Sequence, residues 1–358
     1  MDNKKIYIIH KRGAKRHFEA IENLKNEGYL KETVYLELNF FKKFVKGVLY
    51  LKPGKIIRAV RNFILFIYLL LMGGKNIVLS LEPFDSMIIF AKMLARNNRI
   101  IFFSSWPFWN GNRLPQKKKL LENYFIRSWK RFLSNVDVVT VTEAAKNSID
   151  KFIGKNKTDV IPHCVNKDIF HPRKDYLNVG EKINILFVGR IIECKGISHI
   201  KKLIKELDKN KYYFNIVGNG RDKDLIDDVF KQKNVKYHGK IKDKDRLTKV
   251  FRSNDVLILP SYKKDTWEEL FGIVLIEAMA SGLVPVATDC VGPKEIIDDK
   301  INGLLIEQNN YKQLKEAVEY LQNNRKKLKI FKENSYEKSK KYSVKKCSDN
   351  WRREIDIL

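Results

Sequence analysis

The chain has 358 residues, of which 44% are hydrophobic and 31% are charged. This composition excludes a disordered chain, and the length suits two domains better than one core. A formal net charge of +28 attracts polyanions, so nucleic acid, an anionic membrane face and a phosphorylated ligand are all admissible partners. Four widely spaced cysteines without a cleavable leader ahead of them predict a reduced, cytoplasmic protein without disulfides or structural zinc.

Apolar runs typical of strands alternate with segments of helix length from the start of the chain. Strands are expected at 4–10, 76–81, 99–104, 137–142 and 159–165, with helices at 17–28 and 116–135. This alternation predicts an α/β domain with a largely parallel sheet. Gly13 follows the first strand, in HKRGAKRHF, where it either admits a phosphate or forms a plain turn.

Residues 40–75 interleave lysines and arginines with aromatic and aliphatic residues and end in FILFIYLLLM. That apolar run of about ten residues is too short to cross a bilayer, which needs about 20. Two interpretations stay open: a buried helix with a basic solvent face, or an amphipathic surface that docks on a membrane. They are compatible, because one helix can bury its inner side and present lysines to lipid.

After a polar stretch at 171–184 the alternation restarts. Further strands are expected at 183–189, 213–218, 235–239, 255–260 and 283–288. We therefore expect a first domain over 1–172 and a second over 173–335. Residues 336–358 are basic with few apolar positions, and we expect a helical segment that packs back on the first domain. KDKD at 242–245 resembles an Asp-x-Asp metal motif, but its place between a strand and a helix favours helix capping.

Glycines and cations follow the second-domain strands where open α/β sheets bind ligands, at the carboxyl ends. FVGRIIECKGI places Arg190 and Lys195 after the first of these strands, and IVGNGRD places Gly218 after the next. Two cations at such an edge suit a phosphate, and glycine lets a ligand approach the backbone closely. A solvated basic face and a simple tight turn explain the same residues without a ligand.

The segment TWEELFGIVLIEAMASGLVPVAT places two acids, Glu269 and Glu277, around an apolar run. A helix that starts near Gly272 offers N–H groups from about Phe271 to Val274 and the positive end of its dipole, which suit a diphosphate without a metal. Glu277 lies about five residues into that helix, roughly 7.5 Å along its axis. The two acids would flank one diphosphate and accept hydrogen bonds from sugar and ribose hydroxyls. Alternatively, both form salt bridges with the many lysines.

These motifs, with VTVTEAAKNSI (139–149), VIPHCVNKDIFHP (160–172) and NGLLIE, resemble the donor-binding half of glycosyltransferase family 4, whose members are retaining enzymes of GT-B fold. The resemblance is strong over about residues 137–310. It implies an α/β protein with two Rossmann-like domains that face each other across a cleft, and a C-terminal helix that returns to the first.

The resemblance also implies roles for the motif residues. Arg190 and Lys195 would bind the donor diphosphate, Glu269 would contact the sugar hydroxyls, and these three would be catalytic. Glu277 would bind the ribose, and the loop at Ile241 would frame the base. Backbone N–H groups would bind phosphate or sugar at Phe271, Gly272, Ile273 and Val274.

The first domain departs from the family pattern at two places. Family members often have a glycine-rich turn after the first strand, where this chain has Gly13 alone among basic residues, and many have a histidine in the crevice. Here FFSSWPFWNGN instead places Ser105, Trp106 and Trp109 in that neighbourhood as candidate acceptor-binding residues. The two tryptophans either stack on sugar rings or pack in the core.

The sequence thus predicts a metal-independent, cofactor-free retaining glycosyltransferase whose donor is a nucleoside diphosphate sugar, with UDP expected. The charge and segment 40–75 predict a peripheral protein at the inner face of the cell membrane, with a lipid-linked or glycan acceptor of a bacterial surface polymer. The alternative is a protein of GT-B fold that has lost turnover and assists a partner glycosyltransferase. Nucleic acid is not an expected partner, because no recognised basic reading motif is present.

Overall fold

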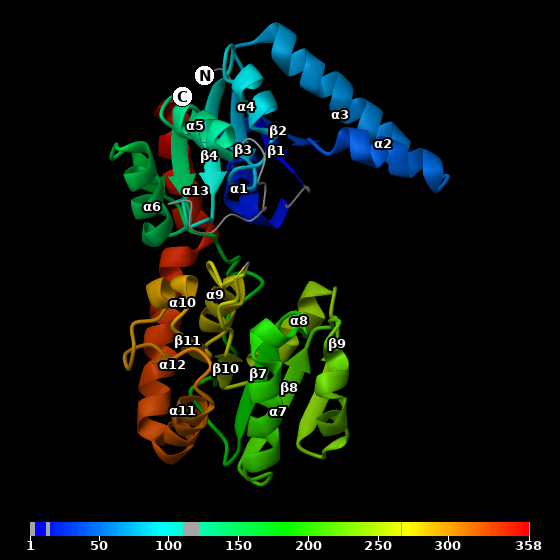
Figure 1. The fold of residues 1–358 in the computed structure, drawn as a ribbon. Helices are drawn as coiled ribbons and strands as arrows, with labels where there is room; N and C mark the ends of the chain where they lie inside the picture. Colours follow the sequence, from blue (N-terminus) through cyan, green and yellow to red (C-terminus); the bar gives the residue numbers. More distant parts are fainter. Residues whose placement is uncertain (1–3, 12–14, 110–121, 266, 358) are drawn as a thin grey trace. The chain divides into compact units, whose positions relative to one another are not determined.

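The chain folds into two compact units. The computed structural model describes residues 4–11, 15–109, 122–265 and 267–357, and Figure 1 shows their fold. One unit comprises Met1–His163 with Cys347–Leu358, and the other comprises Cys164–Lys346. The units therefore divide after His163 and after Lys346, whereas the sequence analysis places boundaries after residues 172 and 335. Each unit is built on a six-stranded sheet of parallel pairs.

The sheet of the first unit has the strand order β2-β1-β3-β4-β5-β6. Its strands are β1 (Lys4–His10), β2 (Leu30–Glu37), β3 (Asn76–Ser80), β4 (Arg99–Ser104), β5 (Asp137–Thr140) and β6 (Thr158–Val160). The strands predicted from the sequence do not include β2. This edge strand buries only Leu30 and Leu36 among its eight residues, so it lacks the apolar run of a central strand.

The helices of the first unit follow from caps and apolar spacing. They are η1 (Lys15–Phe18), α1 (Glu19–Asn26), α2 (Phe40–Leu49), α3 (Pro53–Met72), α4 (Ile88–Leu94), α5 (Glu122–Leu133) and α6 (Glu143–Ile153), joined by the end of α13 (Val344–Ile357). In α6, the Thr142 side chain accepts the Ala145 N–H at 3.2 Å, and Gly154 ends the helix in the left-handed region. Residues 116–121 of the predicted helix at 116–135 lie outside the described residues.

The end of α13 packs in the first unit. The Trp351 ring lies 5.7 Å from that of Phe103 on β4, and the Ser348 hydroxyl donates to the carbonyl of Ala20 on α1 at 2.8 Å. The chain therefore closes on the helix and the sheet with which it began. The remainder of this core is rich in aromatic side chains, with Trp109 and Trp129 fully buried.

The sheet of the second unit has the strand order β12-β11-β10-β7-β8-β9. Its strands are β7 (Ile183–Val188), β8 (Tyr212–Val217), β9 (Val235–Gly239), β10 (Val256–Leu259), β11 (Val284–Thr288) and β12 (Leu304–Ile306). The first five are predicted from the sequence. Four of them, β7, β8, β10 and β11, are largely buried and read as apolar runs, whereas the edge strand β9 buries only Val235 and β12 has three residues.

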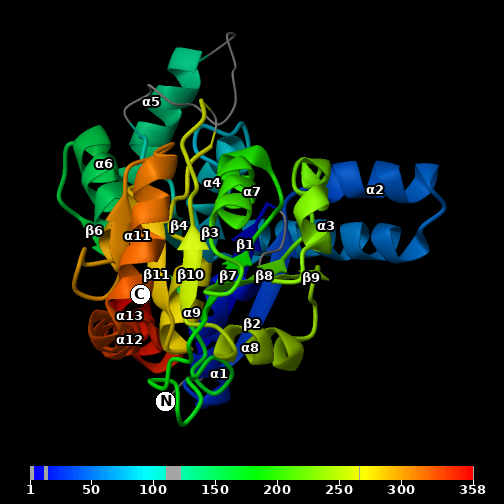
Figure 2. The ribbon, with the colours of Figure 1, turned by 90° about the horizontal axis from the view of Figure 1, so that it is seen from below.

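Helices cover both faces of this second sheet. They are η2 (Glu193–Lys195), α7 (Ile197–Glu206), η3 (Lys223–Leu225), η4 (Asp227–Lys231), α8 (Lys244–Arg252), α9 (Ile273–Ala280), α10 (Val291–Ile296), α11 (Tyr311–Asn323), α12 (Arg325–Ser339) and η5 (Lys340–Tyr342). Figure 2 shows α7 and α11 on one face and α8, α9 and α12 on the other. Such a doubly wound sheet leaves the carboxyl ends of its strands open to a ligand.

Residues 40–75 form two helices, α2 and α3, that lie side by side and project from the strands of the first unit (Figures 1 and 2). Pro53 begins α3, where its missing N–H costs no hydrogen bond. Ala59, Asn62, Phe66 and Leu69 form the buried stripe of α3, while many apolar side chains of both helices are exposed. In the part of the chain that the structure describes, no helix has the length and apolarity needed to cross a membrane.

Candidate donor site at the carboxyl edge of the second sheet

The strand order of the second sheet creates one natural crevice. The first strand of the unit, β7, pairs with β8 on one side and with β10 on the other. Connections leave β7 and β10 in opposite directions, so the loops beyond their carboxyl ends separate and leave space between them. Open α/β sheets bind their ligands at this switch point.

The loop after β7 is held rigidly and carries Arg190. The Gly218 and Gly220 positions face its backbone so closely that a Cβ there would lie 1.8 Å from the Gly189 oxygen and 1.9 Å from the Ile191 oxygen. The Ile191 N–H in turn donates to the Asn219 carbonyl at 3.1 Å. Loop packing therefore accounts for both glycines, and Arg190 stays exposed without an ion pair to any described residue.

Lys195 ends the short helix η2, and its ammonium is directed at the loop after β10. Gly196 turns the chain in the left-handed region with φ +74°, where a Cβ would lie 2.2 Å from the Pro260 carbonyl oxygen. The Lys195 Nζ pairs with Glu269 Oε2, and their side chains are 12% and 13% exposed. It also lies 4.9 Å from the ring centre of Trp267, within cation–π range.

The helix predicted near Gly272 is α9, and glycine is needed at its start. Gly272 has φ +87° and precedes Ile273, the first helical residue. The turn before it is fixed by Gly292, whose added Cβ would lie 2.3–2.4 Å from backbone atoms of Phe271. The Gly292 N–H donates to the Glu269 carbonyl at 3.1 Å. Glu269 and the start of α9 therefore belong to one rigid loop. The N-terminus of α9 in this loop favours a bound anion.

The three glutamates of this segment have different surroundings. Glu269 faces Lys195, whereas its neighbour Glu268 is buried and accepts the Val291 N–H at 3.2 Å, at the start of α10. Glu277 lies on the second turn of α9 and is 5% exposed. Sequence reasoning missed Glu268 and Gly292. The doublet EE does not show which acid faces a ligand, and a glycine in VGPKE does not show which backbone it contacts.

Other predicted positions are more peripheral or outside the described structure. Ile241 is half-buried in the loop after β9. The prediction that KDKD caps a helix is confirmed, because the Asp243 side chain accepts the Arg246 N–H of α8 at 2.7 Å. Gly13 lies outside the described residues. Within the described ranges, no group of three or more His, Cys, Asp or Glu residues is placed to hold a metal ion.

The candidate acceptor residues lie in the first unit. Trp109 is fully buried, its backbone N–H donates to the Ser148 hydroxyl, and its indole N–H donates to the Trp106 carbonyl at 2.8 Å. It presents no face to a sugar, so of the two interpretations of Trp109 the core one holds. Trp106 is half-buried and donates its indole N–H to the Phe108 carbonyl at 3.0 Å, and Ser105 is half-buried beside it.

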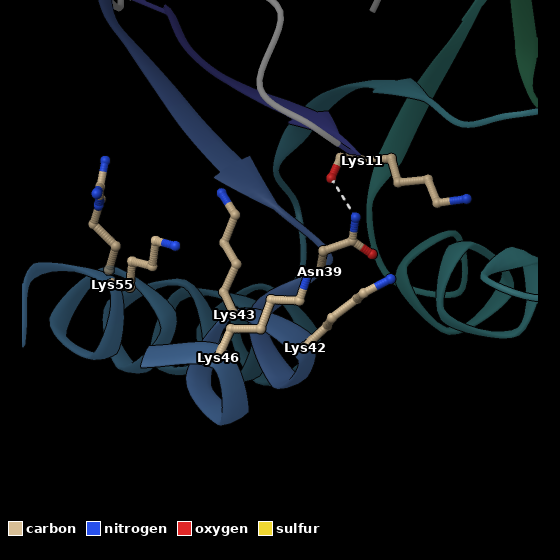
Figure 3. A pocket seen from close by; sticks show the side chains of 7 residues that line it. Lys11, Asn39, Lys42, Lys43, Lys46 and Lys55 are labelled. Atoms are coloured by element: carbon tan, nitrogen blue, oxygen red, sulfur yellow. Dashed lines mark hydrogen bonds between the residues drawn. The ribbon is translucent and has the colours of Figure 1, made fainter. Parts of the chain in front are cut away.

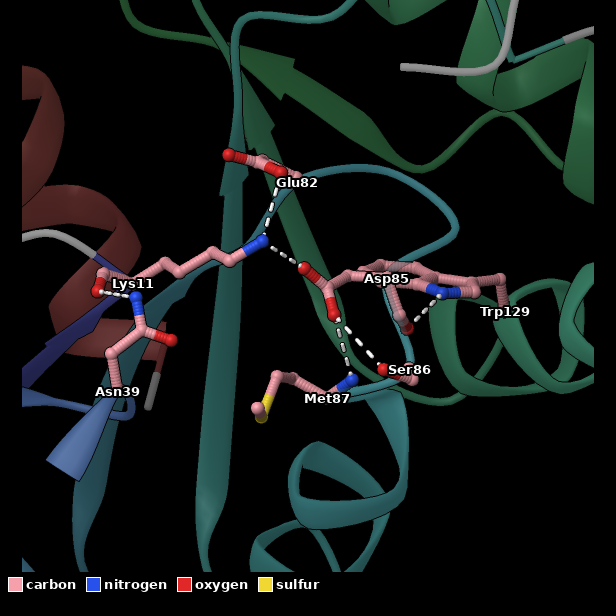
Figure 4. A network of polar contacts seen from close by, with 7 residues as sticks. All are labelled: Lys11, Asn39, Glu82, Asp85, Ser86, Met87 and Trp129. Carbon is pink, nitrogen blue, oxygen red and sulfur yellow. Dashed lines mark hydrogen bonds and ion pairs between the residues drawn. The ribbon is translucent and has the colours of Figure 1, made fainter. Parts of the chain in front are cut away.

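The first sheet has a comparable arrangement at its own switch point, between β1 and β3. Lys11, just after β1, donates from Nζ to Glu82 at 2.9 Å and to Asp85 at 2.5 Å, both of which follow β3. The indole N–H of Trp129 donates to the Asp85 carbonyl at 3.1 Å (Figure 4). In each unit a lysine and carboxylates thus join the loops beyond the two diverging strands.

Comparisons with known proteins agree with this architecture. Residues 168–338 match the family model described as glycosyl transferases group 1. An uncharacterized glycosyltransferase of Methanocaldococcus jannaschii is 34% identical over 234 residues, which cover 64% of this chain and 62% of that protein. The N,N'-diacetylbacillosaminyl-diphospho-undecaprenol alpha-1,3-N-acetylgalactosaminyltransferase of Campylobacter jejuni is 30% identical over 182 residues, 49% of this chain and 45% of that protein. The chain thus spans less than two thirds of the length of these relatives.

Solved structures match over nearly the whole chain. Sucrose-phosphate synthase from Thermosynechococcus elongatus gives a TM-score of 0.72 at 16% identity, over 99% of this chain and 100% of that chain. Anabaena HepE in complex with UDP gives 0.70 at 12% identity, over 99% of this chain and 100% of that chain. The protein therefore has the two-domain α/β GT-B fold. The residues that match the family model lie within its second unit.

Proposed function

We propose that the protein is a retaining glycosyltransferase of family 4 that uses a nucleoside diphosphate sugar, with UDP as the expected nucleotide. One observation carries the proposal: the Lys195–Glu269 pair joins the loops of β7 and β10 at the switch point, beside the N-terminus of α9. This arrangement lies within the matched domain. HepE, which shares the fold, was solved with UDP, and this supports the choice of nucleotide.

In the proposed reaction, Arg190, Lys195 and the N-terminus of α9 stabilise the negative charge of the leaving group. Cleavage of the bond between the anomeric carbon and phosphate builds negative charge on the nucleoside diphosphate and positive charge on the sugar. The two cations stabilise this negative charge. They are joined by the backbone N–H groups from Phe271 to Val274, where Gly272 leaves room for the diphosphate. They perform this task without a metal or another cofactor.

Carboxylates assist the same step on both sides of the diphosphate. Glu269 accepts hydrogen bonds from the sugar hydroxyls and supports the positive charge that develops on the sugar. Glu277 accepts from the ribose, and the loop at Ile241 frames the base. Since Lys195 neutralises Glu269 before the donor arrives, donor binding places its diphosphate against a cation that is already held in place.

We further propose a lipid-linked or glycan acceptor of a bacterial surface polymer, bound by the first unit near Ser105 and Trp106. The relative from Campylobacter jejuni is named for transfer onto a diphospho-undecaprenol-linked sugar. The net charge of +28 supports a peripheral location at the inner face of the cell membrane. Such a location would bring the enzyme to a lipid-linked acceptor.

Hydrolysis and transfer assays test the proposal. The purified protein is incubated with a panel of UDP-, GDP- and ADP-sugars, with and without a lipid-diphosphate sugar acceptor, and nucleoside diphosphate release is measured. We expect turnover of at least one donor, and a loss of about 100-fold or more in Glu269→Ala, since removal of one group that stabilises transition-state charge costs about 10²–10³-fold. Glu307→Ala, an exposed acid on the loop before α11, is the matched control. Absence of turnover with every donor would contradict the proposal and favour the binding-protein alternative.

A further inference from the structure

The α2–α3 hairpin exposes apolar side chains along both helices and the connection between them. Leu51, in that connection, is 88% exposed, and Leu71 near the end of α3 is 75% exposed. Other exposed apolar residues are Phe41, Phe44, Val45, Val48, Leu49, Tyr50, Ile57, Val60, Phe63, Ile64, Ile67, Tyr68 and Met72. An accumulation of exposed apolar side chains of this kind marks an interaction site.

The same hairpin contains a strongly cationic hollow of about 480 Å³ (Figure 3). Lys42, Lys43, Lys46, Lys55 and Arg58 line it, with Lys11 and Asn39 at its base. No acidic residue occurs between positions 40 and 75. Lys42, Lys46 and Lys55 make no ion pair with any described residue, so the hollow has more positive charge than the protein compensates.

Lys43 lies in an unfavourable environment for a positive charge. Its Nζ pairs with Glu37, yet burial and the nearby charges of Arg58 and Lys55 lower its pKa. A bound phosphate would reduce this repulsion and stabilise all the cations of the hollow together. Its oxygens can accept hydrogen bonds from the ammonium and guanidinium groups that line the hollow.

The hollow has a fixed base. The Asn39 side-chain amide donates to the Lys11 carbonyl at 2.9 Å, which ties the start of α2 to the end of β1. Glu82 and Asp85 hold the Lys11 ammonium on the other side (Figure 4). Asp85 is fixed in turn, because its Oδ1 accepts the Met87 N–H at 3.0 Å. These contacts connect the hairpin to the carboxyl edge of the first sheet.

The two helices are also held close together. Gly47 of α2 lies against Ile56 of α3, where an added Cβ would be 2.7 Å from the Ile56 Cγ1 atom. A second hollow, of about 300 Å³, is lined entirely by apolar residues of the hairpin, namely Phe40, Phe41, Phe44, Ala59, Val60 and Phe63. The hairpin therefore combines a cationic hollow with an aromatic one.

We propose that the α2–α3 hairpin docks the protein on an anionic phospholipid bilayer. Lipid phosphates occupy the cationic hollow, and the exposed apolar side chains enter the boundary between headgroups and acyl chains. A lipid supplies both chemistries at once, whereas a nucleic acid lacks the apolar part. This docking specifies how the protein would reach the membrane location proposed above, and it rests on that proposal. Vesicle binding itself does not require the glycosyl transfer reaction.

Vesicle co-sedimentation tests the cationic hollow. The full chain is mixed with vesicles of phosphatidylcholine alone or with about 30% phosphatidylglycerol, at about 0.1 M and 0.5 M salt. We expect binding only to the anionic vesicles and a decline at high salt. The triple variant Lys42→Glu/Lys46→Glu/Lys55→Glu should lose at least on the order of 100-fold in partition coefficient, because loss of the three lysine charges alone costs about fivefold each. The control Lys326→Glu/Lys327→Glu/Lys329→Glu changes the net charge equally on α12 and should retain binding. Equal behaviour of the two triple variants, or no binding by the wild type, would overturn the proposal.

A second variant tests the apolar surface. Leu49→Ser/Leu51→Ser/Leu71→Ser keeps every charge and should reduce binding to anionic vesicles at both salt concentrations. Sedimentation velocity without vesicles examines the rival occupant: a wild-type dimer that this variant converts to a monomer would identify a second copy of the chain on this surface and refute lipid docking. Donor hydrolysis is measured in vesicle-free solution. Failure of donor hydrolysis with vesicle binding intact contradicts the proposed reaction and leaves this inference standing. Failure of vesicle binding with hydrolysis intact contradicts this inference and the proposed membrane location, but not the proposed reaction.

Discussion

Replacement of Lys195 by methionine should weaken UDP binding strongly. Methionine keeps the apolar stem beside Trp267 and removes the charge that is 12% exposed and paired with Glu269. A hydrogen bond to a charged group contributes about 1.5–3 kcal/mol, which is about 10–150-fold in Kd. The upper part of that range is expected, because the variant leaves Glu269 uncompensated next to the incoming diphosphate.

Isothermal titration of UDP into the wild type and Lys195→Met measures the effect. Lys201→Met is the matched control, since Lys201 belongs to the same unit and pairs with Asp228 at 3.0 Å on the surface of α7. Such surface pairs contribute about 0–1 kcal/mol to stability, and this contribution does not depend on UDP. The Kd of the control for UDP should therefore lie within about twofold of the wild-type value. A Kd for Lys195→Met within about twofold of the wild type would refute the assignment of the diphosphate to this crevice.

Three further predictions concern stability and loop geometry. Lys332→Met should lower the free energy of unfolding by about 3–5 kcal/mol in urea titration, because it leaves the buried Asp255 carboxylate without its partner at 2.8 Å. Burial, with Asp159 and Asp137 nearby, raises the pKa of Glu354 from 4.5 to about 7. The folded state therefore binds this proton more tightly than the unfolded state does. As a result, the free energy of unfolding falls as the pH rises from 4.5 to about 7. Glu354→Gln should therefore change nothing near pH 4 and raise the unfolding free energy by about 1 kcal/mol at pH 8, the full shift being reduced by partial exposure. Gly292→Ala should displace the loop of Phe271 and lower the free energy of unfolding by about 1–3 kcal/mol. It should also weaken UDP binding in calorimetry.

The Lys332 and Gly292 predictions each have a matched control variant. Lys338→Met breaks the more exposed pair with Asp298 and should cost less than about 1 kcal/mol. Gly180→Ala adds a methyl group with no neighbour within 4 Å and should leave UDP binding intact. An equal loss of unfolding free energy in the two lysine variants would contradict the role of the Lys332–Asp255 pair. Identical pH dependence of wild type and Glu354→Gln would contradict the environment of Glu354. Unchanged UDP affinity in Gly292→Ala would contradict the role of the Gly292–Phe271 contact.

The sequence predicts the second sheet well because four of its strands, β7, β8, β10 and β11, are largely buried. The runs INILFV and YYFNIV of β7 and β8 are almost wholly apolar, and such runs identify central parallel strands without any knowledge of their order. The edge strand β2 and the three-residue β12 carry too little apolar signal for this reasoning. The helix at Ile273 is predictable, because a glycine precedes a long apolar run.

The contacts of the site are less predictable than its residues. Arg190, Lys195 and Glu269 are identifiable from their places after apolar runs, but the pairing of Lys195 with Glu269 depends on β7 lying beside β10. That neighbour relation is a property of the folded sheet. Likewise, the sequence FFSSWPFWNGN does not reveal that Trp109 completes an aromatic core.

The hairpin shows a similar limit. Residues 40–75 leave two interpretations open in the sequence, because apolar residues are too dense to separate a buried stripe from an exposed one. The structure divides them: Phe66 and Leu69 are buried, while Ile64 and Leu71 of the same helix are exposed. The packing of α3 against its unit decides which apolar residues remain available.

The central claim is that the crevice beyond β7 and β10 binds a nucleoside diphosphate sugar. Thermal unfolding of wild type and Glu277→Ala, with and without a panel of nucleoside diphosphates and their sugars, tests it most directly. A ligand at 100 times its Kd adds about 2.7 kcal/mol to the free energy of unfolding, so a cognate UDP-sugar should raise the wild-type Tm by several degrees. Glu277→Ala should lose most of that increase. No increase with any nucleotide, or an equal increase in both proteins, would contradict the claim.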